Sequence, residues 1–223
     1  MKVIYKYIFS FLFCFLLGFP LFSQDTEKKK EPWKITGVKI GMDVGRFSSY
    51  ILKPEKTSYA GSLDIGFNNK YFAVFEYGYS EINLEKSSYD YFSDGTFWKV
   101  GFDYNMLKKY PTDYLGIGFR FGQANFDHIA ENISKDYSHW GNNITSTPLV
   151  KHSASWLEVS IGVKAELIKN VYFGWSALIK VHVTGGKDNA FQPYDIPGFG
   201  NPSNVINLGA NYFIYYQIPF NRK

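Results

Sequence analysis

After residue 33 the chain alternates, in segment after segment, between large apolar residues and small or charged ones. In FWKVGFDYN, residues 97–105, every second position from Trp98 to Tyr104 is bulky and apolar, and the positions between them carry Lys, Gly, Asp and Asn. Successive side chains of a β-strand point to opposite faces of the sheet. The segment is therefore predicted to be a strand with one apolar face and one face of glycine and charge.

The same period-two pattern recurs often enough to predict a whole sheet. No pattern of helical period competes with it after the N-terminal segment. The eight predicted strands cover residues 36–45, 58–67, 71–80, 97–105, 115–122, 157–166, 173–182 and 206–214. Their lengths are close to the roughly 9–11 residues that a tilted strand needs to cross a bilayer.

The volume of the apolar residues indicates which face points inward. An eight-stranded barrel has an interior just wide enough to be filled by side chains. The alternative, a soluble barrel of the lipocalin type, would overfill this interior with Phe, Trp, Tyr, Leu, Ile and Val. The predicted fold is therefore all-β, an eight-stranded antiparallel up-and-down transmembrane β-barrel whose apolar faces contact lipid and whose glycine and charged residues line the lumen.

The connections between the predicted strands alternate strictly in length. Residues 68–70, 106–113 and 168–170 are short or modest links, and residues 46–56, 81–95, 125–152 and 185–203 are longer. Outer-membrane barrels have short periplasmic turns and longer external loops, and an even strand number leaves both termini in the periplasm. Aromatic residues near the strand ends are predicted to form interfacial girdles: Tyr71, Tyr104, Tyr114, Tyr172 and Phe220 beside the short turns, and Tyr79, Trp98 and Trp156 beside the long loops.

The N-terminus has the pattern of a secretory signal peptide, with two lysines, a short apolar run and a small residue near the end. The apolar run is shorter than a membrane-spanning helix requires. The predicted organisation is a signal peptide at residues 1–23, a flexible periplasmic lead-in at 24–32 and an outer-membrane β-barrel at 33–223. The net charge of +4 is too small and too dispersed to indicate binding of nucleic acid.

The inward faces of the predicted strands carry nearly balanced charge. Because an unpaired buried charge is costly, we expect these side chains to pair and to close the lumen. The alternative is a narrow pore for ions or small solutes. The predicted lumen residues are Lys39, Asp43, Asp64, Glu76, Lys99, Asp103, Arg120, Glu158, Lys164, Glu166, Lys180 and His182.

An enzyme that modifies lipid A by acyl hydrolysis or transfer is a second alternative. His182 with Ser160 or Ser176 and with Glu158 could supply the residue types of a hydrolase. A Gly-x-Ser-x-Gly motif is absent from the sequence, and we predict no catalytic residues. The spacing of His128, His139 and His152 fits no metal site, so neither a metal nor another cofactor is expected.

The long loops contain aromatic residues that could contact a protein partner. The alternative is ordered surface loops shaped by Pro and Gly. The candidate contact residues are Phe126, Tyr137, Trp140, Tyr194 and Phe199.

The stretches FWKVGFDYN, SWLEVSIGVKAELIKNVYFG and YDIPGFG, together with the N-terminal segment, resemble a family of small outer-membrane β-barrels of unknown function from Bacteroidetes-type bacteria, the domain-of-unknown-function family 6048. The resemblance implies an exported protein of the cell outer membrane and supplies no catalytic residues. By analogy with the large export and insertion machines of such envelopes, it implies a structural or accessory subunit that contacts outer-membrane lipid and other envelope proteins.

Overall fold

The computed structural model of this protein describes residues 32–46, 54–107, 113–137, 141–186 and 192–219. The chain divides into two units, Met1–Trp33 and Lys34–Lys223, and the barrel is the second. The predicted signal peptide and nearly all of the predicted lead-in lie outside the described residues. Among the described residues, no helix is long and apolar enough to span a membrane.

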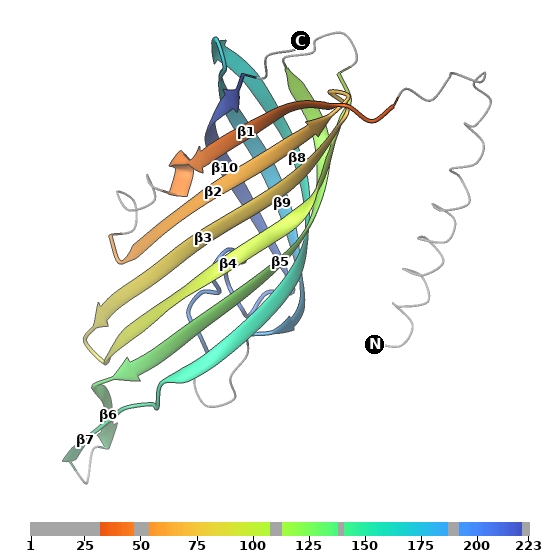
Figure 1. Cartoon of the computed structure of the whole chain (residues 1–223). Coiled ribbons are helices and arrows are strands. Elements are labelled where there is room, and N and C mark those ends of the chain that lie inside the picture. Colours follow the sequence, from red (N-terminus) through yellow and green to blue (C-terminus); the bar gives the residue numbers. More distant parts are fainter. Residues whose placement is uncertain (1–31, 47–53, 108–112, 138–140, 187–191, 220–223) are drawn as a thin grey trace, which may run out of the picture. The chain divides into compact units, whose positions relative to one another are not determined.

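In the described part of the second unit, eight antiparallel strands close into a barrel with the order β1-β10-β9-β8-β5-β4-β3-β2 (Figure 1). The remaining two strands, β6 and β7, form a separate hairpin. The strands are β1 (Ile35–Asp43), β2 (Lys56–Phe67), β3 (Tyr71–Lys86), β4 (Tyr89–Asn105), β5 (Tyr114–Glu131), β6 (Ile133–Tyr137), β7 (Gly141–Thr145), β8 (Val150–Ile168), β9 (Val171–Gly185) and β10 (Ile206–Ile218). The predicted eight-stranded up-and-down barrel is confirmed.

The predicted orientation of the two faces of the strands is also confirmed. On β1, Lys39 and Asp43 are buried in the barrel, whereas Ile40 and Met42 are 53% and 64% exposed on its outside. The exposed apolar side chains continue around the barrel on all eight strands. An uninterrupted apolar surface of this extent is favourable against lipid and unfavourable against water. We call this surface the apolar belt.

Three of the aromatic residues predicted for the interfacial girdles lie inside the barrel. Tyr114, Tyr172 and Trp156 are almost completely buried, so their assignment to the outer surface was wrong. Each occupies the inward parity of its strand. Trp156 packs over Gly122 of the neighbouring strand, where an added Cβ would lie 2.3 Å from the indole ring, and the glycine therefore makes room for it.

The short turns lie at the same end of the barrel as the start of β1 and the end of β10. Asn68 and Asn69 have φ values of 51° and 54°, which is the left-handed backbone of a tight β-hairpin turn. The first and last strands pair over residues 38–43 of β1 and 213–218 of β10. This pairing, the β1–β10 seam, is much shorter than the β3–β4 pairing, which runs from Tyr71 to Lys86.

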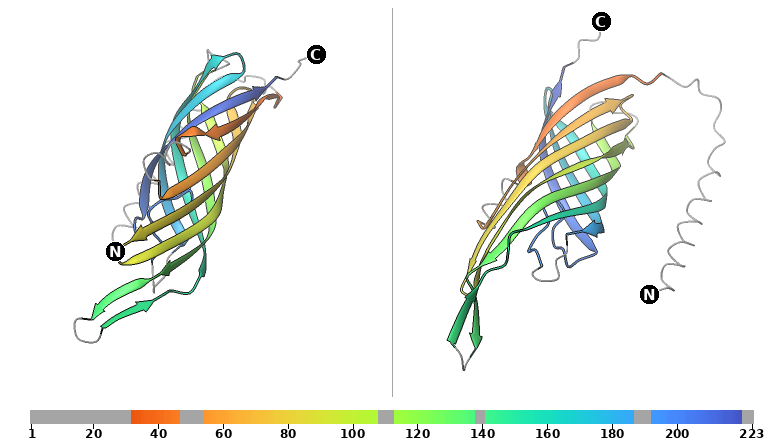
Figure 2. Two further views of the ribbon diagram at one scale, coloured as in Figure 1. Left: turned by 90° about the vertical axis from the view of Figure 1, so that its left-hand side faces the viewer. Right: turned by 60° about the horizontal axis from the view of Figure 1, so that its bottom comes forward.

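The predicted loop at residues 81–95 is instead a continuation of the sheet. β3 runs on to Lys86 and β4 begins at Tyr89. Beyond about residue 80 the two faces exchange character, because Ile82 is buried on the inner face and Glu81 is exposed on the outer one. We call residues 80–86, 89–96 and 125–131 the sheet extension. It projects past the other strand ends, and β6 and β7 continue in the same direction (Figure 2).

Candidate functional site

A group of buried ion pairs fills the middle of the lumen. Lys99 is completely buried, and its Nζ lies 2.8 Å from Glu76 Oε2 and 3.2 Å from Glu158 Oε2. Lys99 and Glu76 are directly opposite each other on β4 and β3. Glu158 lies on β8, so this ion pair crosses the lumen side of β5. The lysine therefore connects three strands of the barrel.

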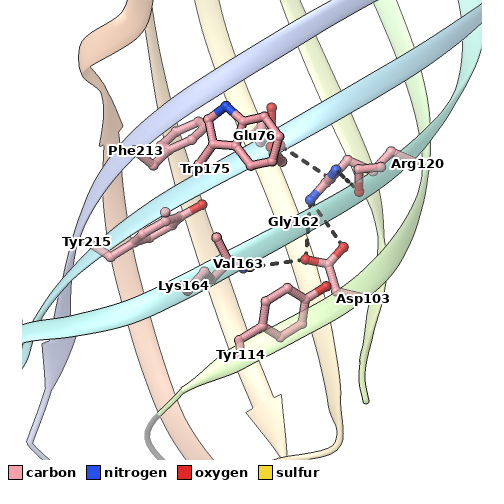
Figure 3. Close-up of a pocket in the computed structure, with 13 residues that line it drawn as sticks. Glu76, Asp103, Tyr114, Arg120, Gly162, Val163, Lys164, Trp175, Phe213 and Tyr215 are labelled. Atoms are coloured by element: carbon pink, nitrogen blue, oxygen red, sulfur yellow. Dashed lines mark hydrogen bonds and ion pairs between the residues drawn. The ribbon is translucent and has the colours of Figure 1, made fainter. Parts of the chain in front are cut away.

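Arg120 on β5 connects further carboxylates (Figure 3). Its guanidinium lies 3.1 Å from Asp103, 3.3 Å from Glu76 and 3.5 Å from Glu158, and it donates a hydrogen bond of 2.8 Å to Ser160 Oγ. Arg120 is opposite Gly101 of β4. A Cβ at Gly101 would lie 2.0 Å from the Phe119 carbonyl oxygen and 2.8 Å from Arg120 Cα. Glycine at this position therefore permits the close approach of the two strands.

Lys164 extends the ion pairs across the barrel toward β2. Its Nζ lies 2.5 Å from Asp64 Oδ2 and 3.4 Å from Asp103 Oδ2. Asp64 also accepts a hydrogen bond from Ser62. Lys39 is directly opposite Asp64 on β1. We call the connected side chains the lumen network: Asp64, Glu76, Lys99, Asp103, Arg120, Glu158 and Lys164.

Little space remains inside the lumen network. The cavity lined by Glu76, Asp103, Arg120 and Tyr215 has a volume of about 20 Å³. About 10–15 Å³ on this measure is enough for one water molecule. At this depth, the cavity has no room for a hydrated ion or a larger solute.

A second barrier is formed by the connection between β9 and β10. We call its described part, residues 192–205, the loop plug. Ile196 and Phe199 are buried against Phe97 and Trp156 of the barrel wall, and the rings of Trp156 and Phe199 are 5.8 Å apart. Lys180 of β9 donates a hydrogen bond of 2.8 Å to the Gly198 carbonyl oxygen. These contacts fix the loop plug to the long-loop end of the lumen.

An ion pair outside the predicted set also holds the loop plug. Lys56 Nζ on β2 lies 2.5 Å from Asp195 Oδ2. Arg46, which the sequence placed at the start of a loop, bonds to Asp43 at 3.0 Å and lies over the Phe97 ring. Its spacing of three residues from Asp43 was a signal for the first of these contacts. The pairing of Lys56 with Asp195 joins distant segments and had no local signal.

Five of the predicted lumen residues make their described contacts outside the lumen network. The Lys39 ammonium lies 3.6 Å from the centre of the Tyr172 ring, and Glu166 accepts a hydrogen bond from the Asn170 backbone at a short turn. His182 is hydrogen-bonded to the Gly185 carbonyl oxygen and packs against Phe199. Asp43 and Lys180 have the contacts described above. The predicted lumen residues are therefore divided among the network, its two ends and the loop plug.

Of the five predicted partner-contact residues, two are buried, one is exposed, and the side chains of the other two lie outside the described part of the chain. Phe126 and Phe199 are only 2% and 1% exposed, because both pack in the cluster that holds the loop plug. They therefore do not form a contact surface. Tyr194 is 47% exposed and lies beside Tyr91. The Tyr137 side chain and the whole of Trp140 lie outside the described residues.

The residues considered for an acyl hydrolase are far apart. Ser160 is opposite Leu178 on β9, and His182 is four residues further along that strand, a separation of roughly 13 Å. Ser176 and His182 are six residues apart on one strand, roughly 20 Å. The proposed Ser–His pairs are therefore not formed. Among the described residues, no group of three or more His, Cys, Asp and Glu side chains is arranged to hold a metal ion.

A family model described as "Domain of unknown function (DUF6048)" matches residues 4–223. No curated protein matches the sequence. Among solved structures, a major outer membrane protein from Thermus thermophilus is similar, with a TM-score of 0.49 and 9% sequence identity over 84% of this chain and 100% of that chain.

Proposed function

We propose that this chain, which belongs to the DUF6048 family, is a non-conducting outer-membrane barrel. In this proposal it serves as a structural or accessory subunit of an assembly or export complex in the envelope. In this proposal both termini are periplasmic, because the start of β1 and the end of β10 lie on the side of the short turns. The long connections and the sheet extension then face the outside of the cell.

The filling of the lumen by ion pairs and by the loop plug supports this proposal most directly. The lumen network crosses the barrel from β2 to β8 through Lys164 and Asp64, and the loop plug covers one end. A barrel built for diffusion would leave a water-filled channel, as larger porins do. Charges paired at this density instead give the barrel a rigid, filled interior, which suits an anchor for elements outside the membrane.

The first test is electrical. The full-length protein, purified in detergent and inserted into planar lipid bilayers, is expected to give no discrete conductance steps. The reason is that the lumen network crosses the barrel and the cavity beside Glu76, Asp103 and Arg120 has a volume of only about 20 Å³. A general porin inserted in the same way is the positive control. Reproducible single-channel steps from the protein would contradict the non-conducting barrel and would support the alternative of a narrow pore.

The second test concerns the accessory role. After extraction of native membranes in mild detergent, we expect the protein to migrate on native gels in a complex larger than one copy with its detergent, together with other envelope proteins. A small barrel of unrelated function from the same membranes is the control for random co-migration. A strictly monomeric protein in all mild detergents would contradict the accessory role.

A further inference from the structure

The outer face of the sheet extension carries two rows of acidic residues. Strand register places Glu81, Asp94 and Asp127 side by side in the first row. Four residues further along β3, β4 and β5 it places Glu85, Asp90 and Glu131 in the second. We call these six residues the acidic face: Glu81, Glu85, Asp90, Asp94, Asp127 and Glu131.

This arrangement is unfavourable for the isolated protein. Like charges directly opposite one another on a sheet destabilise it, and the described contacts offset this only weakly. Lys151, itself 83% exposed, lies 3.8 Å from Asp127, and such an exposed pair contributes little to stability. Asp90 accepts a hydrogen bond from Asn132. A cationic surface laid on the face would therefore relieve repulsion that the fold itself maintains.

Between the two charged rows, the same face has a row made of Asn83 and two apolar residues. Phe92 is 43% exposed, and Ile129, directly opposite it on β5, is half-buried. At the base of the face is a hollow of about 510 Å³, lined by Tyr79, Thr96 and Asp127 among others. An exposed aromatic residue with a charged rim and an adjacent hollow is the usual arrangement of a protein-binding surface.

The spacing of the charges distinguishes a protein from smaller or lipid ligands. Neighbours within a row are roughly 5 Å apart at Cβ, and the rows are separated by four residues, roughly 13 Å. The charge is thus spread over a surface, and no metal-holding group occurs among the described residues. The phosphates of lipid headgroups have the same sign of charge as the face and would be repelled.

We propose that the acidic face is the docking surface for a protein partner with a surface rich in Lys and Arg. This inference rests on the proposed accessory role and specifies the chemistry of the partner. On β4 the outer residues change from Trp98 to the polar Thr96 at the edge of the apolar belt. The face therefore begins where the belt ends, and a partner standing beside the barrel at the membrane surface would reach it.

The test uses a photo-crosslinking residue, p-benzoyl-phenylalanine, in the full-length protein in native membranes. Position 92 lies on the acidic face, and position 102 is the matched control, since Phe102 points outward from the same strand within the apolar belt. We expect a protein adduct from position 92 whose contact peptides are rich in Lys and Arg. The adduct should decrease as salt is raised, because attraction between exposed charges is screened.

The charge dependence is measured with the triple variant Glu81→Gln, Asp94→Asn, Asp127→Asn. It should lower the adduct from position 92, and the affinity for the purified partner, by about tenfold or more. Removing like-charge repulsion should leave the barrel at least as stable, which the shift of the folded band on unheated gels verifies. The control variant Glu55→Gln, Asp113→Asn, Glu166→Gln removes as many charges away from the face and should keep the adduct.

Several results would overturn the inference. One is an adduct that the triple variant leaves unchanged, and another is a partner whose contact peptides lack basic residues. A lipid adduct that EDTA abolishes would assign the face to cation-bridged lipid instead. If position 92 gives no protein adduct while the protein still migrates in a complex, the docking surface is wrong and the accessory role stands. If no complex forms at all, the accessory role fails as well.

Discussion

Replacing Arg120 by methionine is expected to lower the free energy of unfolding by about 3–5 kcal/mol, as removal of one partner from a buried ion pair does. The variant loses contacts to Asp103, Glu76 and Glu158 at once. Lys99 and Lys164 would then be left with four buried carboxylates. Urea unfolding in detergent micelles, followed by the gel shift between the folded and the unfolded protein, measures the effect.

Two variants serve as controls for this experiment. Lys151→Met also removes a cation from an ion pair, but this pair is exposed and 3.8 Å long, so we expect a loss below about 1 kcal/mol. Arg120→Lys keeps the charge but cannot reproduce the planar fork of donors, and its stability should lie between the wild type and the methionine variant. Equal stabilities for Arg120→Met and Lys151→Met would show that the lumen network contributes little to folding.

Truncating Trp156 to alanine is expected to have an effect of similar size, about 3–5 kcal/mol, because it leaves a cavity in a fully buried cluster. The indole packs between Gly122 of β5 and Phe199 of the loop plug. The variant should therefore also release the loop plug. Limited proteolysis, with mapping of the cleavage sites, should show faster cutting within residues 192–205.

Trp98→Ala is the matched control for Trp156→Ala, since Trp98 points outward from the barrel and contacts Phe121 at a ring separation of 5.7 Å. Its loss should cost less and should leave the proteolysis of the loop plug unchanged. If both tryptophan variants accelerated cleavage of residues 192–205 equally, the cluster around Trp156 would not be what holds the loop.

The barrel could be predicted from the sequence because lipid imposes one simple condition on every strand. Each outward position within the bilayer must be apolar, so the eight strands repeat one pattern that can be read without any homologous sequence. The same parity rule places Lys99, Asp103 and Arg120 inward, where they meet in the lumen network. It also places Tyr114 and Trp156 inward, and the girdle prediction failed because it considered their position along the strand and ignored their parity.

The sheet extension could not be recognised by the same rule. Outside the bilayer the outer face meets water, so Glu81 and Asp94 replace apolar residues there, while Ile82 and Tyr91 fill the inner face. The alternation therefore continues, but the apolar residues are now on the inner face and the polar residues on the outer face. A search for apolar outward positions ends at residue 80 and takes the remainder for a loop. A search for period-two alternation, regardless of which face is apolar, would have extended the predicted strands.

The loop plug depends on contacts between segments that are distant in sequence. Phe199 packs against Trp156, and Asp195 pairs with Lys56. The sequence could show that Phe126 and Phe199 were aromatic residues in loops, but whether a loop folds over or into a barrel depends on the shape of the opening. Prediction from the sequence therefore treated as exposed two aromatic side chains that are buried.

The short seam between β1 and β10 affects the order in which the strands of the barrel pair during folding. Neighbouring strands such as β3 and β4 are joined by tight turns and pair along their whole length, so they can form early at little cost in chain entropy. The seam unites the two ends of the barrel sequence over residues 38–43 and 213–218 alone. Contacts between such distant segments form late. The barrel is therefore expected to form first as an open, curved sheet, and β1 and β10 are expected to pair last. In a partly unfolded barrel, β1 and β10 should be the first strands to separate.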